Sequence, residues 1–581
     1  MKYRFVPGDA AELRRWSASI RAAVQRLAQA SRTDSEFHAI GEGPAVVTIG
    51  GDAQELAAAG LRVVALSDVD RSREADLLLE GRSPLANAVD EALAAVRWFK
   101  RHGAESVALY GKGDGGAVAL HAAILLGDNA PVAIEGYHDL RALGLPGTLR
   151  YADLPDLYAA LAPRPLWTDF ADQTLVDAYK AFEASDRLES GTSLVEFLKR
   201  PVAASFSIPP LRVYFDTPAR IEVSDRIDQV LSSGMLTQGK LVVEFEELAK
   251  RFTGGDPVAV STGTAALDIA YQLLNVAGKT VLAPVNTFFA TAASVERMGG
   301  KVDFVDVELE GFGMDPHALR EALERHDSAG DPVAAVVVVH IGGVVAPSFK
   351  DILAECTARG IPVVEDTAHA LGATLDGQLA GTMGVMGTYS LHPAKVATSG
   401  EGGFFIAQDP AHTDAARKLR DHGKISIDKN IHDRLGNNWR LSEVHAAVGL
   451  AHFGQLDEML RMRRELAAWY DEHIDGVPRV TRYEIPPGAQ SNYYKYIAFL
   501  DPAVDRAELK ARLRQRHGVS LAGEVYDVLL SDQPYFAQRF AGRSFANASW
   551  FTRHHICLPA FPSMTTAEQR HVLSALRSEL S

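Results

Sequence analysis

The stretch SLHPAKVATSGEGG, residues 390–403, places Lys395 between apolar and glycine-rich neighbours. Upstream, the stretch VVEDTAHALGA puts Asp366 directly after the apolar run 361–364. Short apolar runs bounded by glycine are typical of buried parallel strands. A carboxylate that follows such a strand lies at the carboxyl edge of the sheet, where open α/β folds bind ligands. The two stretches therefore predict an α/β fold with a site around Lys395 and Asp366.

This pair of residues has a specific chemical meaning. A lysine amine can hold an aldehyde cofactor as a Schiff base, and a buried carboxylate can keep a pyridine nitrogen protonated, so that the ring withdraws electrons. Lys395 and Asp366 supply these two groups. We therefore expect an enzyme that uses pyridoxal 5′-phosphate.

Other positions suit the phosphate and the ring of the same cofactor. The stretch STGTAALDIAYQLL passes at once into a helical pattern, so we expect the N–H groups of Gly263 and Thr264 to face a phosphate from a helix N-terminus. An ordinary strand-to-helix turn explains the pattern equally well. Ser390 can add a hydroxyl donor. Phe288, in APVNTFFATAA, can stack on the ring, although an aromatic residue there is more often part of the core.

Length and composition limit the class of protein. A chain of 581 residues exceeds the roughly 250 to 300 residues of a single core, so two or three domains are expected. With 47% hydrophobic and 23% charged residues, neither disorder nor a fibrous repeat is indicated. The net charge of −15 argues against a nucleic-acid or anionic-membrane partner. A small-molecule substrate is the better expectation.

The sequence favours a cytoplasmic location. The aliphatic run 333–339 is far shorter than the roughly 20 residues that span a bilayer. The N-terminus has no apolar signal-peptide core, and the stretch 12–30 predicts an amphipathic surface helix rather than a transit peptide. Cys356 and Cys557 lie in apolar settings, so no disulfide framework is expected.

Two series of alternating strands and helices divide the chain, with the proline-punctuated stretch 201–212 as the expected linker. In the first series, strands are expected at 45–49, 61–66 and 106–110, and a helix at 89–101. In the second, strands are expected at 258–260, 280–283, 302–307, 334–339 and 362–365, and a helix at 349–359 with a capping box of Ser348 and Asp351 and a stop at Gly360. The expected domains are 1–205, 206–455 and a smaller α+β lobe at 456–581.

Five ordered motifs carry a family resemblance. They read STGTAAL, PVNTFFAT, EDTAHA, SLHPAKVATSGEGG and NWRLSE. From about residue 213 to its end, the chain resembles the DegT, DnrJ, EryC and StrS group of sugar aminotransferases, a branch of the fold-type I pyridoxal-phosphate enzymes. The resemblance implies a large α/β domain with a mostly parallel sheet, followed by a small C-terminal α+β domain.

The resemblance also implies a role for each site residue. Lys395 corresponds to the Schiff-base lysine and proton shuttle, and Asp366 to the partner of the pyridine nitrogen. Gly263, Thr264 and Ser390 correspond to the phosphate contacts. Asn438 is implied to reach the phosphate of the neighbouring subunit, which makes a homodimer the expected unit.

The chain departs from the family pattern at two places. His369 stands where glutamine is usual beside the ring hydroxyl, and HIGG at 340–343 replaces the commoner HxYG. A histidine can still donate a hydrogen bond, so we expect the cofactor contact to survive. The departures put the substrate preference in doubt.

The reaction implied by the resemblance is amino transfer from glutamate or glutamine to a ketone. Some relatives carry histidine in place of the lysine and act as dehydratases, so Lys395 favours transamination. The stretch SLAGEVYD, with Glu524 and Tyr526, looks most like members that act on keto-sugars or keto-cyclitols. Two alternatives stay open: a pyridoxal-phosphate-dependent dehydratase or cyclase, and a non-catalytic ligand-binding scaffold.

The first unit resembles α/β-hydrolases of the esterase type but lacks their triad. The nucleophile elbow should read Gly-x-Ser-x-Gly, and GKGDG at 111–115 has Gly113 at the serine position. Asp172 can match the acid, yet no histidine occurs between His138 and His317. Without nucleophile and base, covalent catalysis is lost. We expect a pseudo-hydrolase unit, fused to the enzyme, that builds the dimer or delivers substrate.

Overall fold

The computed structural model describes residues 207–426 and 429–581, and before them only 39–40, 44–50, 52–59, 61–66, 84–101, 104, 107–112, 115–126, 131–135, 166–168 and 188–189. The expected helix at 12–30 and the first half of the expected linker, 201–206, lie outside these residues. The chain divides into two compact units, Met1–Ala204 and Ser205–Ser581. Each unit is described by itself.

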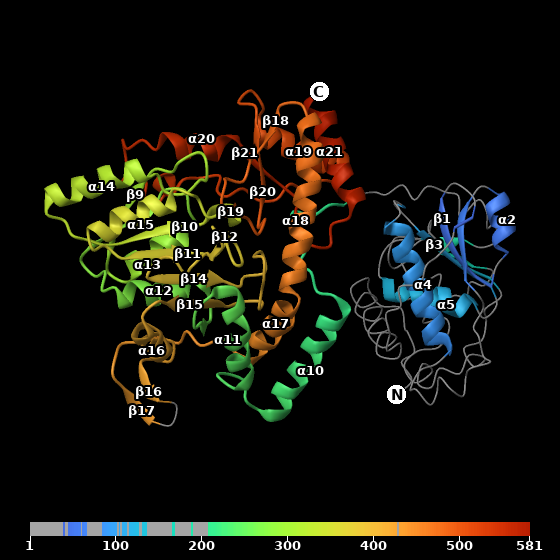
Figure 1. The fold of residues 1–581 in the computed structure, drawn as a ribbon, viewed down its shortest axis with the longest axis horizontal. Coiled ribbons are helices and arrows are strands. Elements are labelled where there is room, and N and C mark those ends of the chain that lie inside the picture. The colour runs from blue at the N-terminus through green and yellow to red at the C-terminus, as the bar shows by residue number, and fades with distance from the viewer. Residues whose placement is uncertain are drawn as a thin grey trace. The chain divides into compact units, whose positions relative to one another are not determined.

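The described part of the first unit contains a parallel six-stranded sheet with the order β2-β1-β3-β4-β5-β6 (Figure 1). Every residue of β1 is buried, as expected for a central strand covered on both faces. The expected strands and helix are confirmed within one or two residues at most ends, although the helix begins five residues early. The strands are β1 (Ala45–Ile49), β2 (Arg62–Leu66), β3 (Val107–Lys112), β4 (Val132–Glu135), β5 (Leu166–Thr168) and β6 (Leu188–Glu189), and the helices are α2 (Ala53–Ala58), α4 (Pro84–Arg101) and α5 (Gly115–Leu126).

The GKGDG stretch of the first unit joins β3 to α5. Gly111 and Lys112 end the strand, and Gly115 begins the helix. Gly113 and Asp114 lie outside the described residues, as do His138 and Asp172. Two residues therefore separate the strand from the helix, and a nucleophile elbow also joins a strand to a helix over a short connection.

The second unit is built on a seven-stranded sheet with the order β7-β15-β14-β11-β10-β8-β9 (Figure 1). All neighbouring strands are parallel except the two pairs made by β15, so the expected mostly parallel sheet is confirmed. The strands are β7 (Val258–Val260), β8 (Thr280–Pro284), β9 (Lys301–Val305), β10 (Val333–Val339), β11 (Val363–Asp366), β14 (Met386–Ser390) and β15 (Gly403–Ala407).

Helices flank this sheet and bury both of its faces (Figure 1). Val336 and Val337 are adjacent in β10 but belong to different apolar clusters, because successive side chains of a strand point to opposite faces. The helices of this part of the chain are α10 (Thr217–Ser233), which packs on α17, and α11 (Lys240–Thr253), α12 (Gly263–Leu273), α13 (Phe289–Arg297), α14 (Pro316–Ala329), α15 (Phe349–Ala358), α16 (Pro410–Leu419) and α17 (Glu443–Gly454).

Local signals explain where several of these helices begin and end. Asp315 caps α14 by accepting a hydrogen bond from the N–H of His317, and Pro316 occupies the first turn. Gly330 ends that helix in the left-handed conformation, at φ +65°. Aspartate, proline and glycine at these three positions are the usual punctuation of a helix.

The expected capping box of α15 is wrong. Ser348 itself has helical angles, and its side chain makes no capping hydrogen bond. Its hydroxyl instead donates to Glu308 Oε1 at 3.1 Å. A carboxylate from a distant segment is a stronger acceptor than a backbone group, so a tertiary contact replaces the local one. Gly360, at φ +66°, follows the end of the helix as expected.

The C-terminal lobe is the small α+β region that the sequence predicts. Its antiparallel sheet has the order β18-β20-β21. Its elements are α18 (Leu456–His473), β18 (Val480–Arg482), β20 (Tyr496–Leu500), α19 (Arg506–His517), α20 (Ala546–His554), β21 (His555–Leu558) and α21 (Thr566–Leu580). Short pieces complete the unit: η3 (Ile341–Gly343), β12 (Thr374–Leu375), β13 (Gln378–Leu379), β16 (Lys424–Ser426), β17 (Lys429–His432), η4 (Ile474–Gly476), β19 (Ala489–Gln490) and η5 (Leu530–Asp532).

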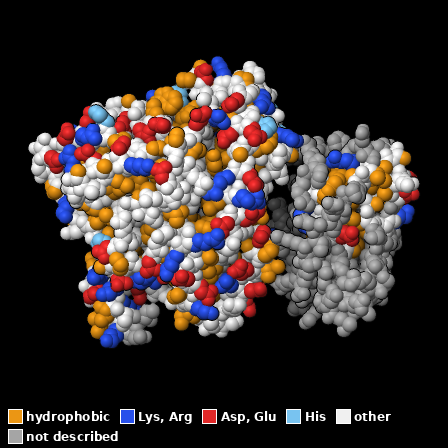
Figure 2. All heavy atoms as spheres, in the orientation of Figure 1, with side chains coloured by type: hydrophobic (Ala, Val, Ile, Leu, Met, Phe, Trp, Pro, Cys, Tyr) orange, Lys and Arg blue, Asp and Glu red, His pale blue; other side chains and the backbone are white. Residues whose placement is uncertain are grey.

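Among the described residues, no helix is both long enough and apolar enough to cross a bilayer. Cys356 and Cys557 are buried free thiols. Figure 2 shows acidic and basic side chains interspersed over the visible face of the second unit, rather than a stripe of one sign. That face has no positive stripe of the kind that binds nucleic acid.

Candidate active site

Several of the quoted motifs meet at one edge of the large sheet. Asp366, at the end of β11, pairs with Val339 of β10 and Thr388 of β14. Because these strands are parallel, the segments that follow them emerge at the same edge. β8 is parallel to β10, so the segment that contains Phe288 emerges there too. The fold therefore brings together residues separated by more than 100 positions in the sequence.

The turn before α12 is packed against the end of β14. A Cβ atom at Gly263 would lie 2.8 Å from the Cβ of Ser390, and one at Gly403 would lie 2.6 Å from the nitrogen of Gly263. Only glycine permits such a close backbone approach. The hydroxyl of Thr262 caps the helix by accepting from the N–H of Ala265 at 3.0 Å.

This arrangement suits an anion. The first N–H groups of a helix have no acceptor within it, and the helix dipole adds positive potential there. Gly263 and Thr264 occupy that first turn, and the hydroxyl-bearing Ser390 lies beside it. These three residues could hold a phosphate group.

Asp366 is a buried carboxylate with defined partners. Its Oδ2 accepts from the hydroxyl of Thr291 at 2.8 Å, and its Oδ1 accepts from the N–H of Ala368 at 3.1 Å. Burial raises the pKa of Asp366, and the hydrogen bond from Thr291 opposes that change. A cationic partner such as a pyridinium nitrogen would compensate the cost of burying the charge.

Lys395 lies in the loop after β14 and is only partly buried. Its Nζ stands over the ring of Tyr494, 5.1 Å from the centroid. Desolvation lowers the pKa of Lys395 to about 8, while the charge of Asp366 acts in the opposite direction. A larger fraction of the amine is therefore neutral near neutral pH, as a nucleophile requires.

His369 joins the site from the loop after β11. Its ring stacks on Tyr494 with centroids 4.2 Å apart, and its Nε2 lies 3.1 Å from the hydroxyl of Tyr526. Burial holds the pKa of His369 well below its usual value, and the charges of Lys395 and Lys495 act in the same direction. The ring is therefore neutral. Its buried Nδ1 has no hydrogen-bond partner among the described residues.

The wall that carries Tyr494 is fixed by Asn492, which is fully buried. The side-chain amide of Asn492 donates to the carbonyls of His369 and Leu371 at 2.8 and 2.9 Å, and its oxygen accepts from the N–H of Tyr494. A Cβ at Gly343 would collide with Asn492 Oδ1 at 1.9 Å. The second glycine of HIGG thus allows the close approach of this wall.

The structure does not bring every expected residue into contact. Phe288 is 58% exposed, with its ring 6.0 Å from that of Tyr526. The exposed residue Asn438 lies in the segment after β17. Tyr526 faces the site through His369, whereas Glu524 is held by Lys510 Nζ at 2.7 and 2.9 Å.

Sequence reasoning missed Thr291, Asn492 and Tyr494. Thr291 lies four positions after Thr287, so both hydroxyls can face the same side, and they are 2.9 Å apart. Tyr494 belongs to the aromatic run NYYKY just before β20. Polar and aromatic residues near the ends of helices and strands were the available signals. The sequence does not show which residues they contact.

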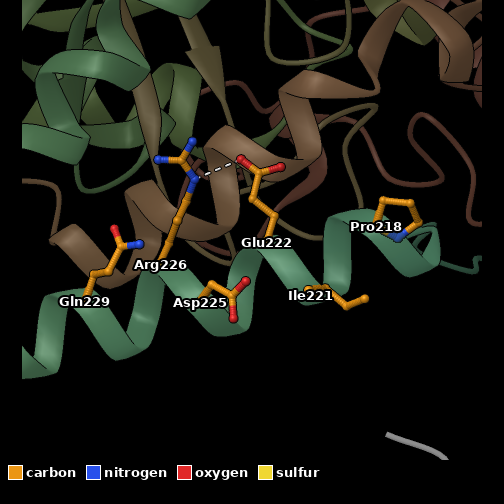
Figure 3. Close-up of a pocket in the computed structure, with 6 residues that line it drawn as sticks. All are labelled: Pro218, Ile221, Glu222, Asp225, Arg226 and Gln229. Atoms are coloured by element: carbon orange, nitrogen blue, oxygen red, sulfur yellow. Dashed lines mark hydrogen bonds and ion pairs between the residues drawn. The ribbon is translucent and has the colours of Figure 1, made fainter. Parts of the chain in front are cut away.

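A separate shallow hollow lies on α10 and does not coincide with this site. Figure 3 shows its lining, which comes from a single helix: Pro218, Ile221, Glu222, Asp225, Arg226 and Gln229. Arg226 is already engaged by Glu222 through its Nε at 2.8 Å. The hollow offers no nucleophile, and the sheet edge remains the better candidate.

Pyridoxal 5′-phosphate fits the residues at the sheet edge. The glycine turn at Gly263 offers an anion site, and Asp366 offers a buried acceptor for the pyridine N–H. Lys395 offers an amine for the aldehyde. The unpartnered Nδ1 of His369 can bond the ring hydroxyl. Two features that the protein alone leaves unexplained, this nitrogen and the open turn, are thereby accounted for.

Comparisons with known proteins agree with this chemistry. Residues 219–577 match the DegT/DnrJ/EryC1/StrS aminotransferase family. EpsN of Bacillus subtilis (strain 168), whose name assigns it provisionally to the pyridoxal phosphate-dependent aminotransferases, is 32% identical over 58% of this chain and 87% of its own length. A Campylobacter jejuni protein (serotype O:23/36, strain 81-176), named UDP-4-amino-4,6-dideoxy-N-acetyl-beta-L-altrosamine transaminase, is 31% identical over 61% of this chain and 94% of its own length.

Solved structures give the same result. A DegT DnrJ EryC1 StrS aminotransferase from Brucella abortus is 27% identical, with a TM-score of 0.58, over 62% of this chain and 96% of its own. The aminotransferase TlmJ from Streptoalloteichus hindustanus is 28% identical, with a TM-score of 0.58, over 64% of this chain and 98% of its own. This chain is a pyridoxal-phosphate-dependent aminotransferase and belongs to the DegT/DnrJ/EryC1/StrS aminotransferase family.

Proposed function

We propose that this enzyme moves an amino group from glutamate or glutamine to the ketone of a sugar or cyclitol in a biosynthetic pathway. The observation that carries the proposal is the placement of Lys395, in the loop after β14, at the same sheet edge as Asp366. The lowered pKa of Lys395 agrees with this placement. The name of the Campylobacter jejuni relative, a transaminase of an amino sugar, supports the acceptor class.

Lys395 is the proposed nucleophile and proton carrier. Pyridoxal phosphate, when bound, supplies a ring that withdraws electrons from the carbon bearing the amino group. With a pKa of about 8, Lys395 Nζ is neutral in about a tenth of the molecules at pH 7, whereas an unperturbed lysine is almost wholly protonated. Nζ can therefore both take up and return a proton near neutral pH.

Asp366 is proposed to bind the pyridine N–H, and Gly263, Thr264 and Ser390 to bind the phosphate. The hydrogen bonds from Thr291 and Ala368 fix the orientation of the carboxylate. These residues would hold the cofactor at its pyridine nitrogen and at its phosphate. Together they would align the cofactor with Lys395, and alignment of this kind lowers the barrier of the step that follows.

His369 is proposed to donate from Nδ1 to the ring hydroxyl. Burial raises the pKa of Tyr526 well above its usual value, so its phenol keeps the proton. A phenol that donates to Nε2 leaves the hydrogen of the neutral imidazole on Nδ1. Phe288 is proposed to cover the ring. The side chain of Phe288 is exposed, so its ring is accessible to a cofactor.

A homodimer is proposed as the functional unit, with Asn438 of the partner subunit at the phosphate. Asn438 is exposed, and the preceding segment displays Ile431 and Leu435 with 55% and 86% of their surface exposed. Large apolar side chains presented together are typical of a surface that another chain covers.

The proposed domains are 1–205, 206–455 and 456–581, in a fused, cytoplasmic protein. We propose that the first is a hydrolase-like unit without catalysis, which builds the dimer or delivers substrate. The parallel sheet and the short turn from β3 into α5 support that ancestry. Removal of residues 1–205 with unchanged oligomeric state, stability and kinetics would count against a role for the unit.

Spectroscopy with amino donors tests the proposed reaction. The purified enzyme is mixed with L-glutamate or L-glutamine, and the absorbance of its aldehyde form should give way to that of pyridoxamine phosphate. No change with either donor would favour dehydration or cyclisation instead. The amine-loaded enzyme is then screened against keto-sugars, keto-cyclitols and other ketones, and consumption of the pyridoxamine form by another class of ketone alone would overturn the proposed acceptor.

A further inference from the structure

A second lysine stands at the ring of Tyr494. Lys495 Nζ lies 5.1 Å from the centroid of that ring, the same distance as Lys395 Nζ. The two amines are therefore no more than about 10 Å apart, since each is held within this distance of one point. Lys495 thus belongs to the wall of the site and not to a remote surface.

The position of Lys495 is built into the backbone. Its N–H donates to the carbonyl of Gly342 at 3.2 Å, and Gly342 adopts φ +67°. A Cβ at Gly342 would meet Ile497 at 2.7 Å. The unusual HIGG sequence and the segment that carries Lys495 therefore form one packed unit.

Apart from the ring of Tyr494, the ammonium of Lys495 has no anionic partner and no hydrogen-bond acceptor among the described residues. No carboxylate oxygen of those residues lies within 4 Å of its Nζ, and no hydrogen bond from this atom is found there. Arg463, a nearby buried cation, is different, because its Nη1 donates to the carbonyls of Tyr493 and Ala560. A partly buried ammonium without an acceptor is costly, and an anionic ligand would relieve that cost.

Neighbouring groups limit which anion fits. Glu524 is paired with Lys510, and Arg506 Nη1 donates to the carbonyls of Thr552 and His555. Lys510 and Arg506 are therefore both already engaged by oxygen atoms of the protein, unlike Lys495. A single unpartnered ammonium matches a single carboxylate better than a doubly charged group.

We propose that Lys495 binds a carboxylate of the amino donor while the donor's amine takes the place of Lys395 Nζ at the reacting carbon. This proposal rests on the proposed amino transfer from glutamate or glutamine. The upper limit of about 10 Å between the two amines allows one ligand to reach both with an amine and a carboxylate a few bonds apart. A charged hydrogen bond of this kind contributes about 1.5 to 3 kcal/mol, or roughly a tenfold to hundredfold change in affinity.

Calorimetry on the cofactor-loaded enzyme tests the site without turnover. The probes are glutarate, which has carboxylates but no amine, and inorganic phosphate. The variants are Lys495→Met, which keeps the length of the side chain, and Lys495→Arg, which keeps its charge. We expect the Kd of glutarate to rise at least about tenfold in Lys495→Met and less than about threefold in Lys495→Arg.

A titration with L-glutamate adds a kinetic readout. In Lys495→Met the half-saturating concentration should rise at least about tenfold, while the rate at saturation changes by less than about threefold, since uniform binding is lost. Thermal unfolding and cofactor content serve as folding controls. If Lys495→Met does not fold, loss of glutarate binding in Lys495→Arg would overturn the proposal, and binding within threefold would support it.

Three outcomes would overturn the carboxylate site. Glutarate can bind Lys495→Met as tightly as the unchanged enzyme, the substitution can weaken phosphate binding alone, or the unchanged enzyme can bind neither probe. Failure of the proposed amino donor can be distinguished from failure of the carboxylate site. In that case L-glutamate causes no absorbance change, although glutarate still binds through Lys495.

Discussion

Both units of this chain lead a strand through a short glycine-containing connection into a helix, but the residues around the two connections differ. In the first unit β3 enters α5 through GKGDG, and Gly113 occupies the position where a hydrolase carries its serine. In the second unit β7 enters α12 at Gly263, and Ser390 and Gly403 close around the turn. A strand–turn–helix supplies backbone N–H groups, whereas catalysis depends on the side chains that other strand ends bring to it.

The largest effect on activity is expected from substitution of Lys395, in the second unit. Lys395→Ala removes both nucleophile and proton carrier, so amino transfer should fall on the order of a thousandfold or more. Steady-state assays with the best donor and ketone measure the loss. Lys350→Ala is the matched control, because Lys350 is exposed on α15 in an ion pair with Asp376. Comparable losses in both variants would contradict the assignment.

Asp366→Asn should lower the activity of the enzyme without lowering the stability of the cofactor-free protein. Breaking a buried charge pair costs about 3 to 5 kcal/mol, so amino transfer should fall on the order of 10² to 10⁴. Near-normal turnover would contradict the role of Asp366. The cofactor-free variant, in contrast, should unfold at the same temperature as the unchanged protein at pH 7, or at a higher one.

The sign of the stability effect follows from the raised pKa of Asp366. The folded state holds this proton more tightly than the unfolded state, so the free energy of unfolding decreases as pH rises from the ordinary aspartate pKa through the raised one. Asparagine does not ionise and escapes that decrease. The advantage of Asp366→Asn should therefore shrink as pH is lowered through this window, which thermal unfolding of cofactor-free protein measures. An advantage that grows on acidification would refute the account.

A smaller effect is expected from substitution of Gly263, in the turn before α12. The methyl group of Gly263→Ala would overlap Ser390, and such overpacking costs about 1 to 3 kcal/mol. Cofactor affinity, followed by fluorescence titration, should fall about tenfold or more if the strain falls on the phosphate site. Gly454→Ala is the control, because nothing lies within 4 Å of a Cβ there. Equal affinities in the two variants would show that the turn does not contact the cofactor.

No gain is expected from restoring a serine to the first unit. Gly113→Ser supplies a hydroxyl at the elbow, yet no histidine lies between His138 and His317 to activate it. Hydrolysis of a p-nitrophenyl ester should stay at the rate of the unchanged protein. A rate clearly above it would mean that a base is present, and that the two turns differ less than their sequences indicate.

Much of the large sheet could be predicted from the sequence. Apolar runs such as 258–260 and 334–339 are buried strands because both faces of a parallel sheet are covered. Asp366 could be placed at the sheet edge because the carboxyl ends of parallel strands share one edge. The turn at Gly263 followed from the change of periodicity at the start of α12.

The opposite wall of the site could not be predicted. Tyr494 reaches Lys395 from the C-terminal lobe, and its place depends on Asn492, whose amide bonds the carbonyl of His369. Such contacts are set by packing between distant segments and leave no local pattern. The capping box at Ser348 failed for the same reason, because Glu308 competes for its hydroxyl.

Borohydride trapping tests the central claim most directly. The purified enzyme is reduced with borohydride and digested, and its peptides are analysed by mass spectrometry. The account predicts a phosphopyridoxyl group on Lys395, in the peptide that contains HPAKVATSGEGG, and none on Lys495. Attachment at another lysine, or no attachment to the enzyme as purified, would contradict it.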